Sequence, residues 1–230
     1  MPDYDAIIIG AGHNGLATAT LLQRSGMRVL CIEKNKYVGG MCSTVELFDG
    51  YKFEIAGSTM FPLADKVVED LKLHEHGFNT IEHEIMSCNI GDSGDPPVIL
   101  YVDGMKQAQH IVEMHGADAA QGMLELFQYV QAPANAMNRF EPLAKPKRVS
   151  DILDGAATEQ EREAIKSVLF GSAMDIIDQF FPDPGKHKVL RAFLAFLAVQ
   201  SAYKGPYTPG SAACLVYSLA IPPGGQLMHK

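Results

Sequence analysis

The sequence is poor in cysteine and tryptophan. Its 230 residues include four cysteines and no tryptophan, and no two cysteines form a C-x-x-C pair. Thiols this few and this scattered exclude a disulfide-stabilised miniprotein and a zinc finger, and they are typical of a reducing compartment. We therefore expect a cytoplasmic protein whose free cysteines behave as small hydrophobic residues.

Long apolar runs and an excess of positive charge are also missing. The longest nearly apolar run covers residues 189–199, is broken by Arg191, and is shorter than the roughly 20 residues that span a bilayer. Met1-Pro2-Asp3 has neither the basic nor the apolar region of a signal peptide. Lys and Arg number 19 against 27 Asp and Glu, and the net charge of -8 argues against nucleic acid as a partner. Contact with a membrane surface stays open.

Apolar residues are plentiful, at 47% of the chain. A chain of this length buries roughly 70% of the surface that its unfolded form exposes, so it can build a real core. A disordered, low-complexity chain is therefore excluded. One large domain or two small domains are expected.

The first 33 residues predict a strand, a helix and a second strand. Residues 4–9 are a short run rich in isoleucine, residues 14–25 have the pattern of a helix that stops at Gly26, and residues 27–33 form another apolar run. Because strand, helix and strand follow within about 30 residues, the two strands are expected to pair in parallel.

A G-x-G-x-x-G sequence joins the first strand to the helix. Gly10 permits a tight turn, Gly12 lets the backbone approach a pyrophosphate, and Gly15 allows the helix to pack closely on the strand. The phosphates are expected at the N-terminus of the helix, and Glu33, at the end of the second strand, is expected to hold the ribose hydroxyls and repel a 2′-phosphate. This arrangement predicts binding of an ADP moiety.

The glycines do not decide between FAD and NAD. Two features favour FAD: the fingerprint lies at the extreme N-terminus, and the pair Gly39-Gly40 lets a second stretch of backbone approach the dinucleotide. At His13 we expect the backbone N–H to matter more than the imidazole.

Residues 5–16, 32–33 and 38–44 resemble the FAD-binding start of phytoene-desaturase-like flavoproteins, in particular the branch called pyridine nucleotide-disulfide oxidoreductase domain-containing protein 2. Shorter patches at 50–53, 70–77, 178–181 and 207–211 fit the same branch. The resemblance implies an α/β fold with a Rossmann-like FAD-binding domain of the glutathione-reductase type, interleaved with a mostly helical α+β substrate domain. In this chain the FAD-binding portion is expected at residues 1–75 and the substrate portion at residues 76–230.

The resemblance also implies a FAD-dependent oxidoreductase, a dehydrogenase, desaturase or isomerase, that acts on a lipophilic substrate of the isoprenoid or carotenoid kind. The residues expected to bind the cofactor are Gly10, Ala11, Gly12, His13, Asn14, Gly15, Glu33, Lys34, Gly39, Gly40, Met41 and Thr44.

The chain departs from this family in two respects. Tyr37 and Met41 stand near the glycine pair where family members often have arginine. Family chains are also longer, and a C-terminal segment returns to complete the flavin site, so the fold is expected to be incomplete at the C-terminus. A C-terminal half or a partner chain is expected to supply the rest. Two alternatives stay open: a non-catalytic subunit that keeps the fold, and an NAD-dependent reductase.

No other motif indicates a catalytic residue or a metal. His74 and His76 are two residues apart and would lie on different faces of a helix. The segment 205–211 lacks the lysine of a phosphate loop. Cys42 could approach a flavin, but a packing role is favoured, and nothing suggests a Cys–His nucleophile pair.

Beyond residue 50 the pattern changes. We expect a helix over 65–73, short strands within 79–86 and 97–113, and mostly helices from about residue 117. Helices are expected at 172–181 and 186–199. An apolar set on and just after them lines a tunnel for the substrate, packs a plain core, or forms an interface patch. This set is Phe180, Phe181, Phe193, Phe196, Leu197 and Tyr203.

Overall fold

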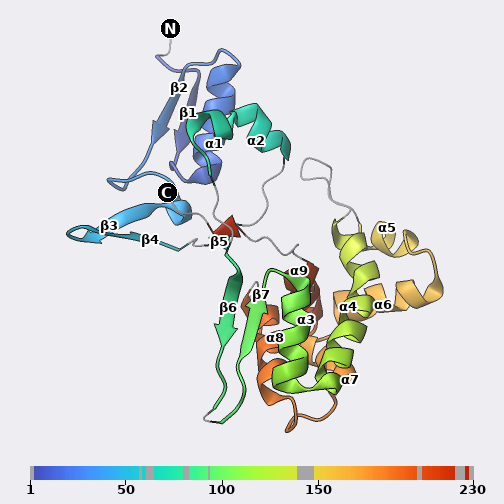
Figure 1. Cartoon of the computed structure of the whole chain (residues 1–230). Coiled ribbons are helices and arrows are strands. Elements are labelled where there is room, and N and C mark those ends of the chain that lie inside the picture. The colour runs from blue at the N-terminus through green and yellow to red at the C-terminus, as the bar shows by residue number, and fades with distance from the viewer. Residues whose placement is uncertain are drawn as a thin grey trace. The chain divides into compact units, whose positions relative to one another are not determined.

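A computed structural model describes residues 3–56, 59–60, 65–79, 83–92, 94–138, 148–200, 204–220 and 226–227. The chain divides into two compact units (Figure 1). Unit 1 comprises Met1–His83 and Gly225–Lys230, and unit 2 comprises Glu84–Gly224. Residues 225–230 therefore belong to the same unit as the N-terminal segment. The expected boundary between residues 75 and 76 stays a prediction.

Unit 1 is built from short strands and helices. Its elements are β1 (Ala6–Ile9), α1 (His13–Arg24), β2 (Val29–Ile32), the 3-10 helix η1 (Gly40–Cys42), β3 (Thr44–Phe48), β4 (Tyr51–Glu54), β5 (Thr59–Met60), α2 (Asp65–Leu71), the 3-10 helix η2 (Leu73–His76) and β8 (Gln226–Leu227).

The first strand, helix and second strand confirm the predicted βαβ unit. β1 and β2 pair in parallel, with Ala6 opposite Val29 and Ile9 opposite Ile32. Arg28, just before β2, forms an ion pair with Asp5 at 3.1 Å and so fixes the register where the pair begins. The α/β Rossmann-like start of the chain is therefore present as expected.

The hairpin of β3 and β4 was not predicted. Thr44 pairs with Glu54 in an antiparallel ladder, and the turn contains Gly50 at a φ of +82°. The carboxylate of Glu46 accepts a hydrogen bond from the Gly50 N–H at 2.8 Å. The dipeptide Asp49-Gly50 between two apolar runs is a strong hairpin signal and would have revealed this turn.

Unit 2 is mostly helical, with one two-stranded antiparallel sheet among its described residues. Its elements are β6 (Ile85–Asn89), β7 (Val98–Tyr101), α3 (Gly104–His115), α4 (Ala117–Asn138), α5 (Val149–Asp154), α6 (Glu159–Phe170), α7 (Ala173–Phe180), α8 (Lys188–Gln200) and α9 (Ser211–Ala220).

The helical part begins earlier than predicted. A short strand was expected within 97–113 and β7 is present there, but helix α3, which follows it, was not expected. Asp103 caps this helix: its Oδ1 accepts a hydrogen bond from the Lys106 N–H at 2.8 Å. The prediction did not use this cap as the signal of a helix start.

The helices of unit 2 surround one hydrophobic core. Phe181, Leu190 and Leu194 are almost completely buried in it. Phe193 lies in the same core and Phe196 is 49% exposed, whereas Tyr203 is outside the described residues. For Phe181 and Phe193, the members of the apolar set that belong to this core, packing is therefore the observed role.

The segment before α9 has a structural role. Ser211 is fully buried; its Oγ accepts a hydrogen bond from the Ala173 N–H at 2.8 Å and donates one to the Pro206 carbonyl at 3.0 Å. The Gly210 N–H donates to the carbonyl of Gly171 at 2.8 Å. These bonds hold the segment against the start of α7.

Candidate dinucleotide-binding site

The first glycine turn connects β1 to α1. Gly10 has a φ of +102°, a conformation that favours glycine, and its N–H donates to the carbonyl of Ile32 at 2.7 Å. A Cβ on Gly15 would lie 2.0 Å from the carbonyl oxygen of Gly10. The close approach of helix and turn that the sequence predicted at Gly15 is therefore present.

A second glycine turn packs on the first. Gly39 and Gly40 both have positive φ, and the Gly39 N–H donates to the carbonyl of Ala11 at 2.7 Å. A Cβ on Gly40 would lie 3.0 Å from the Cα of Gly12. Because the two backbones touch here, a side chain at Gly40 would have to push the turns apart.

Glu33 joins the first turn to the end of β2. Its Oε2 accepts a hydrogen bond from the Ala11 N–H at 2.8 Å, and its Oε1 accepts one from the Asn35 N–H at 2.9 Å. The backbone N–H of Asn35, followed by that of Ala11, holds the pKa of Glu33 below its usual value. The side chain is half-buried and ionised, and each oxygen keeps a lone pair for a further donor.

The N-terminus of α1 lies in the first turn. Gly12 is the N-cap and has no side chain to cap the helix, and the first turn of α1 carries no acidic residue. The positive end of the helix dipole is therefore not neutralised by the helix's own side chains. Such an end attracts a phosphate.

All twelve residues predicted to bind the cofactor lie in unit 1. Residues 10–15 form the first turn and the start of α1, Gly39, Gly40 and Met41 form the second turn, and Thr44 begins β3. Lys34 follows Glu33 and is exposed. Met41 is 63% exposed and free to contact a ligand. Their binding roles stay predictions.

Sequence reasoning missed two features of the second turn. Ser43 is almost fully buried and its Oγ donates to the carbonyl of Val38 at 2.7 Å, which holds the turn closed. The Sγ of Cys42 lies 3.7 Å from the Nδ1 of His13, although no Cys–His pair was expected. The spacing of these two residues in the sequence carries no signal, because only the contact between the turns brings them together.

Within the part of the chain that the structure describes, no three His, Cys, Asp or Glu side chains are grouped as metal ligands. None of the described helices is both long and apolar enough to cross a membrane.

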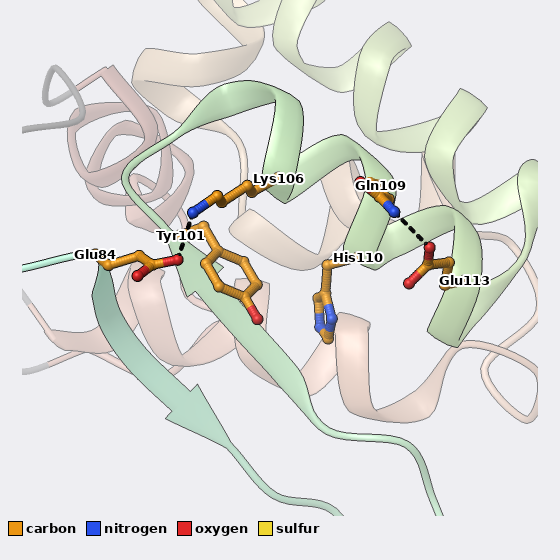
Figure 2. Close-up of a pocket in the computed structure, with 6 residues that line it drawn as sticks. All are labelled: Glu84, Tyr101, Lys106, Gln109, His110 and Glu113. Carbon is orange, nitrogen blue, oxygen red and sulfur yellow. Dashed lines mark hydrogen bonds and ion pairs between the residues drawn. The ribbon is translucent and has the colours of Figure 1, made fainter.

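Unit 2 contains a separate small pocket of about 190 Å³ (Figure 2). It is lined by Glu84, Tyr101, Lys106, Gln109, His110 and Glu113. Glu84 pairs with Lys106 at 2.6 Å, and Gln109 donates to Glu113 at 2.7 Å. The buried His110 accepts a hydrogen bond from the Ile99 N–H at 3.0 Å and contacts the ring of Tyr101. The lining groups thus largely satisfy one another.

Comparison with known proteins supports a dinucleotide-binding role for the turns. Residues 8–72 match the family described as NAD(P)-binding Rossmann-like domain. Pyridine nucleotide-disulfide oxidoreductase domain-containing protein 2 of Rattus norvegicus is 27% identical over 94% of this chain, which spans 40% of that relative's length. A limonene dehydrogenase subunit of Castellaniella defragrans is 33% identical over 50% of this chain and 21% of its own.

Solved structures agree on the fold. A putrescine oxidase triple mutant superposes with a TM-score of 0.58 at 21% identity, over 97% of this chain and 45% of its own. The predicted resemblance to pyridine nucleotide-disulfide oxidoreductase domain-containing protein 2 is confirmed, and residues 8–72 match an NAD(P)-binding Rossmann-like domain.

Proposed function

We propose that this chain binds FAD between its two glycine turns and forms the dinucleotide-binding part of a flavin-dependent oxidoreductase. The observation that carries the proposal is the contact between the two turns, where a Cβ on Gly40 would lie only 3.0 Å from the Cα of Gly12. One glycine turn is enough for a pyrophosphate, whereas a second turn against it extends the cradle along a longer dinucleotide.

The residues present fit FAD. The N-terminus of α1 would hold the pyrophosphate, and Glu33, which already accepts the Ala11 N–H, would accept hydrogen bonds from the ribose. Gly39, Met41 and Thr44 would contact the flavin side. The flavin, when bound, supplies the hydride chemistry, and the chain binds and orients it.

The proposed substrate is lipophilic. The limonene dehydrogenase relative, which this chain resembles over half its length, is named for a substrate that is an isoprenoid hydrocarbon. An isoprenoid or carotenoid-like substrate agrees with the proposed phytoene-desaturase-like class, in which the flavin rather than an acid–base pair carries the reaction.

A further part of the protein is proposed to cover unit 1. The strands β1 and β2 have no third strand beside them among the described residues, and Ile7 and Ile9 are 57% and 88% exposed. Parallel sheets are normally buried on both faces. A C-terminal half or a partner chain would bury these side chains and complete the flavin site. All four cysteines are free, which suits the cytoplasm as the proposed compartment.

The absorbance spectrum of the purified chain after incubation with FAD and desalting tests the proposal. We expect a retained flavin spectrum, and we expect Gly15→Ala to abolish retention because its Cβ would strike the Gly10 carbonyl. Gly104→Ala is the matched control, because no atom lies within 4 Å of a Cβ at that position. Equal retention by both variants contradicts the proposal. A colourless wild-type protein contradicts the claim that the two glycine turns hold FAD without the part that completes the site.

An NAD-dependent reductase is the second candidate, favoured by the name of the matching family. The same retention experiment with NADH, in which bound NADH is measured by its fluorescence, separates the NAD-dependent candidate from the FAD-dependent one. Retention of NADH with no retention of FAD supports this candidate, and Glu33 is then expected to discriminate against NADPH. Retention of flavin without turnover of any substrate would favour the non-catalytic subunit.

A further inference from the structure

The two glycine turns bring a thiol and an imidazole together. The Sγ of Cys42 lies 3.7 Å from the Nδ1 of His13, within the range of a hydrogen bond that involves sulfur. The two residues are 29 positions apart in the sequence. Each closely follows the glycines that touch, so the contact between Gly12 and Gly40 fixes the pair.

The surroundings of Cys42 favour a reactive thiol. His13 is the first residue of α1, and its imidazole lies beside the Cys42 sulfur. A neighbouring imidazole is one of the surroundings that make a cysteine a better nucleophile. The imidazole of His13 is in position to take up the thiol proton. Cys42 is half-buried rather than enclosed, and a small reagent can therefore reach it.

We propose that Cys42 is a modification site for low-molecular-weight disulfides, activated by His13, and that the mixed disulfide prevents the glycine turns from binding a dinucleotide. The Cys42 sulfur attacks one sulfur of the reagent; a new S–S bond forms while the reagent's own S–S bond breaks. The released thiolate takes the proton that His13 has accepted, so one thiol is consumed and one is produced.

The blocking step rests on the proposed function. The second turn approaches the first so closely that a Cβ on Gly40 would already meet Gly12 at 3.0 Å. The Cys42 sulfur contacts the side chain of His13, which is one of the residues proposed to bind the cofactor. An adduct on this sulfur would therefore compete with the dinucleotide for the space beside His13.

Cys88 provides an internal control. It lies on β6 in unit 2 and is more exposed than Cys42. If access alone decided reactivity, Cys88 would react faster. Faster reaction at Cys42 would therefore show the effect of the His13 imidazole rather than of exposure.

The first experiment exposes the whole chain to oxidised glutathione without cofactor and follows each cysteine-containing tryptic peptide by mass spectrometry. We expect Cys42 to react at least about tenfold faster than Cys88, and we expect His13→Gln to remove this advantage without changing Cys88. A Cys42 rate no greater than that of Cys88 overturns the activation, whether or not the variant folds. An unchanged Cys42 rate in His13→Gln overturns it as well.

The second experiment measures FAD retention before and after modification. We expect the modified protein to lose the flavin, dithiothreitol to restore it, and Cys42→Ser to keep it under the same treatment. Retention by the modified wild-type protein overturns the blocking step. If the untreated protein binds no FAD, the blocking step fails together with the proposed function, whereas the comparison of Cys42 with Cys88 still decides the activation.

Discussion

Glu33 shows how one side chain links two parts of the site. Its two oxygens hold the N–H groups of Ala11 and Asn35, so the carboxylate shapes the first glycine turn in addition to its proposed role at the ribose. Its lowered pKa keeps it ionised at neutral pH. A substitution here therefore acts on the turn and on the ligand together.

We expect Glu33→Gln to weaken FAD binding by about tenfold or more. The amide keeps one accepting oxygen and loses the charge, and hydrogen bonds to charged groups contribute about 1.5–3 kcal/mol. Equilibrium titration of FAD, followed by its fluorescence, measures the effect. Glu46→Gln is the control, because Glu46 accepts a bond from Gly50 in the β3–β4 hairpin and lies outside the turns. Equal affinities for the two variants would refute the assignment of Glu33.

Individual residues of the site were predictable to different extents. The roles of Gly10, Gly12 and Gly15 follow from their local spacing, because few backbone conformations allow a tight turn directly before a helix. The contact of Cys42 with His13 depends on how two distant turns pack, and no local pattern encodes it.

At the scale of elements, Arg191 explains why the apolar run of α8 is interrupted. This buried side chain forms an ion pair with Asp178 at 2.5 Å and donates to the carbonyl of Phe181, so it ties α8 to the end of α7. The Phe181 carbonyl lies at the C-terminal end of α7, where the helix leaves such groups without internal partners. A charged residue in an otherwise apolar helix thus has a structural reason.

Arg191→Leu is expected to destabilise the protein by about 2 kcal/mol, since it leaves a buried carbonyl and a carboxylate without their donor. Urea denaturation followed by circular dichroism measures the loss. Arg162→Leu serves for comparison, because Arg162 pairs with Asp154 at the surface and such pairs contribute less than about 1 kcal/mol. Arg191 would have no special role if both variants shifted the midpoint equally.

The elements themselves were predicted best where periodicity and end signals agree. β1, α1, β2, α7 and α8 lie within a few residues of their expected bounds. The β3–β4 hairpin and α3 were missed because their signals, Asp49-Gly50 and the cap Asp103, are short and were not weighed against the surrounding pattern.

At the scale of the whole molecule, the half-buried His115 makes stability depend on pH. Burial lowers the pKa of His115 from its usual 6.5, and the imidazole donates from Nε2 to the carbonyl of Pro97 at 3.1 Å. The unfolded chain takes up the proton near pH 6.5, whereas the folded chain takes it up only at lower pH. Unfolding therefore binds a proton in this window, and acid favours the unfolded state.

We expect the urea midpoint to fall as the pH drops below about 6.5, and to level off below the folded pKa. His115→Gln cannot titrate and should flatten this part of the profile, while His74→Gln, at an exposed position in unit 1, should leave it unchanged. A wild-type profile that is flat between about pH 7 and pH 5 would disprove the role of His115.

Two portions were expected from the sequence, but not that residues 225–230 belong with the first of them. The pattern change after residue 50 indicates a second region, but the return of residues 225–230 to unit 1 depends on contacts between segments far apart in the chain. The predicted dinucleotide fold needed only local information, which explains why it was the most secure part of the expectation.

The exposed isoleucines of β1 have a consequence for synthesis of the protein. The ribosome releases the N-terminus first, at roughly 5–20 residues per second. The nascent chain then displays Ile7 and Ile9 on a strand that unit 1 does not bury, whereas the later helices of unit 2 form a core of their own. We expect this strand to bind chaperones that recognise extended apolar segments until the proposed cover for β1 has been made.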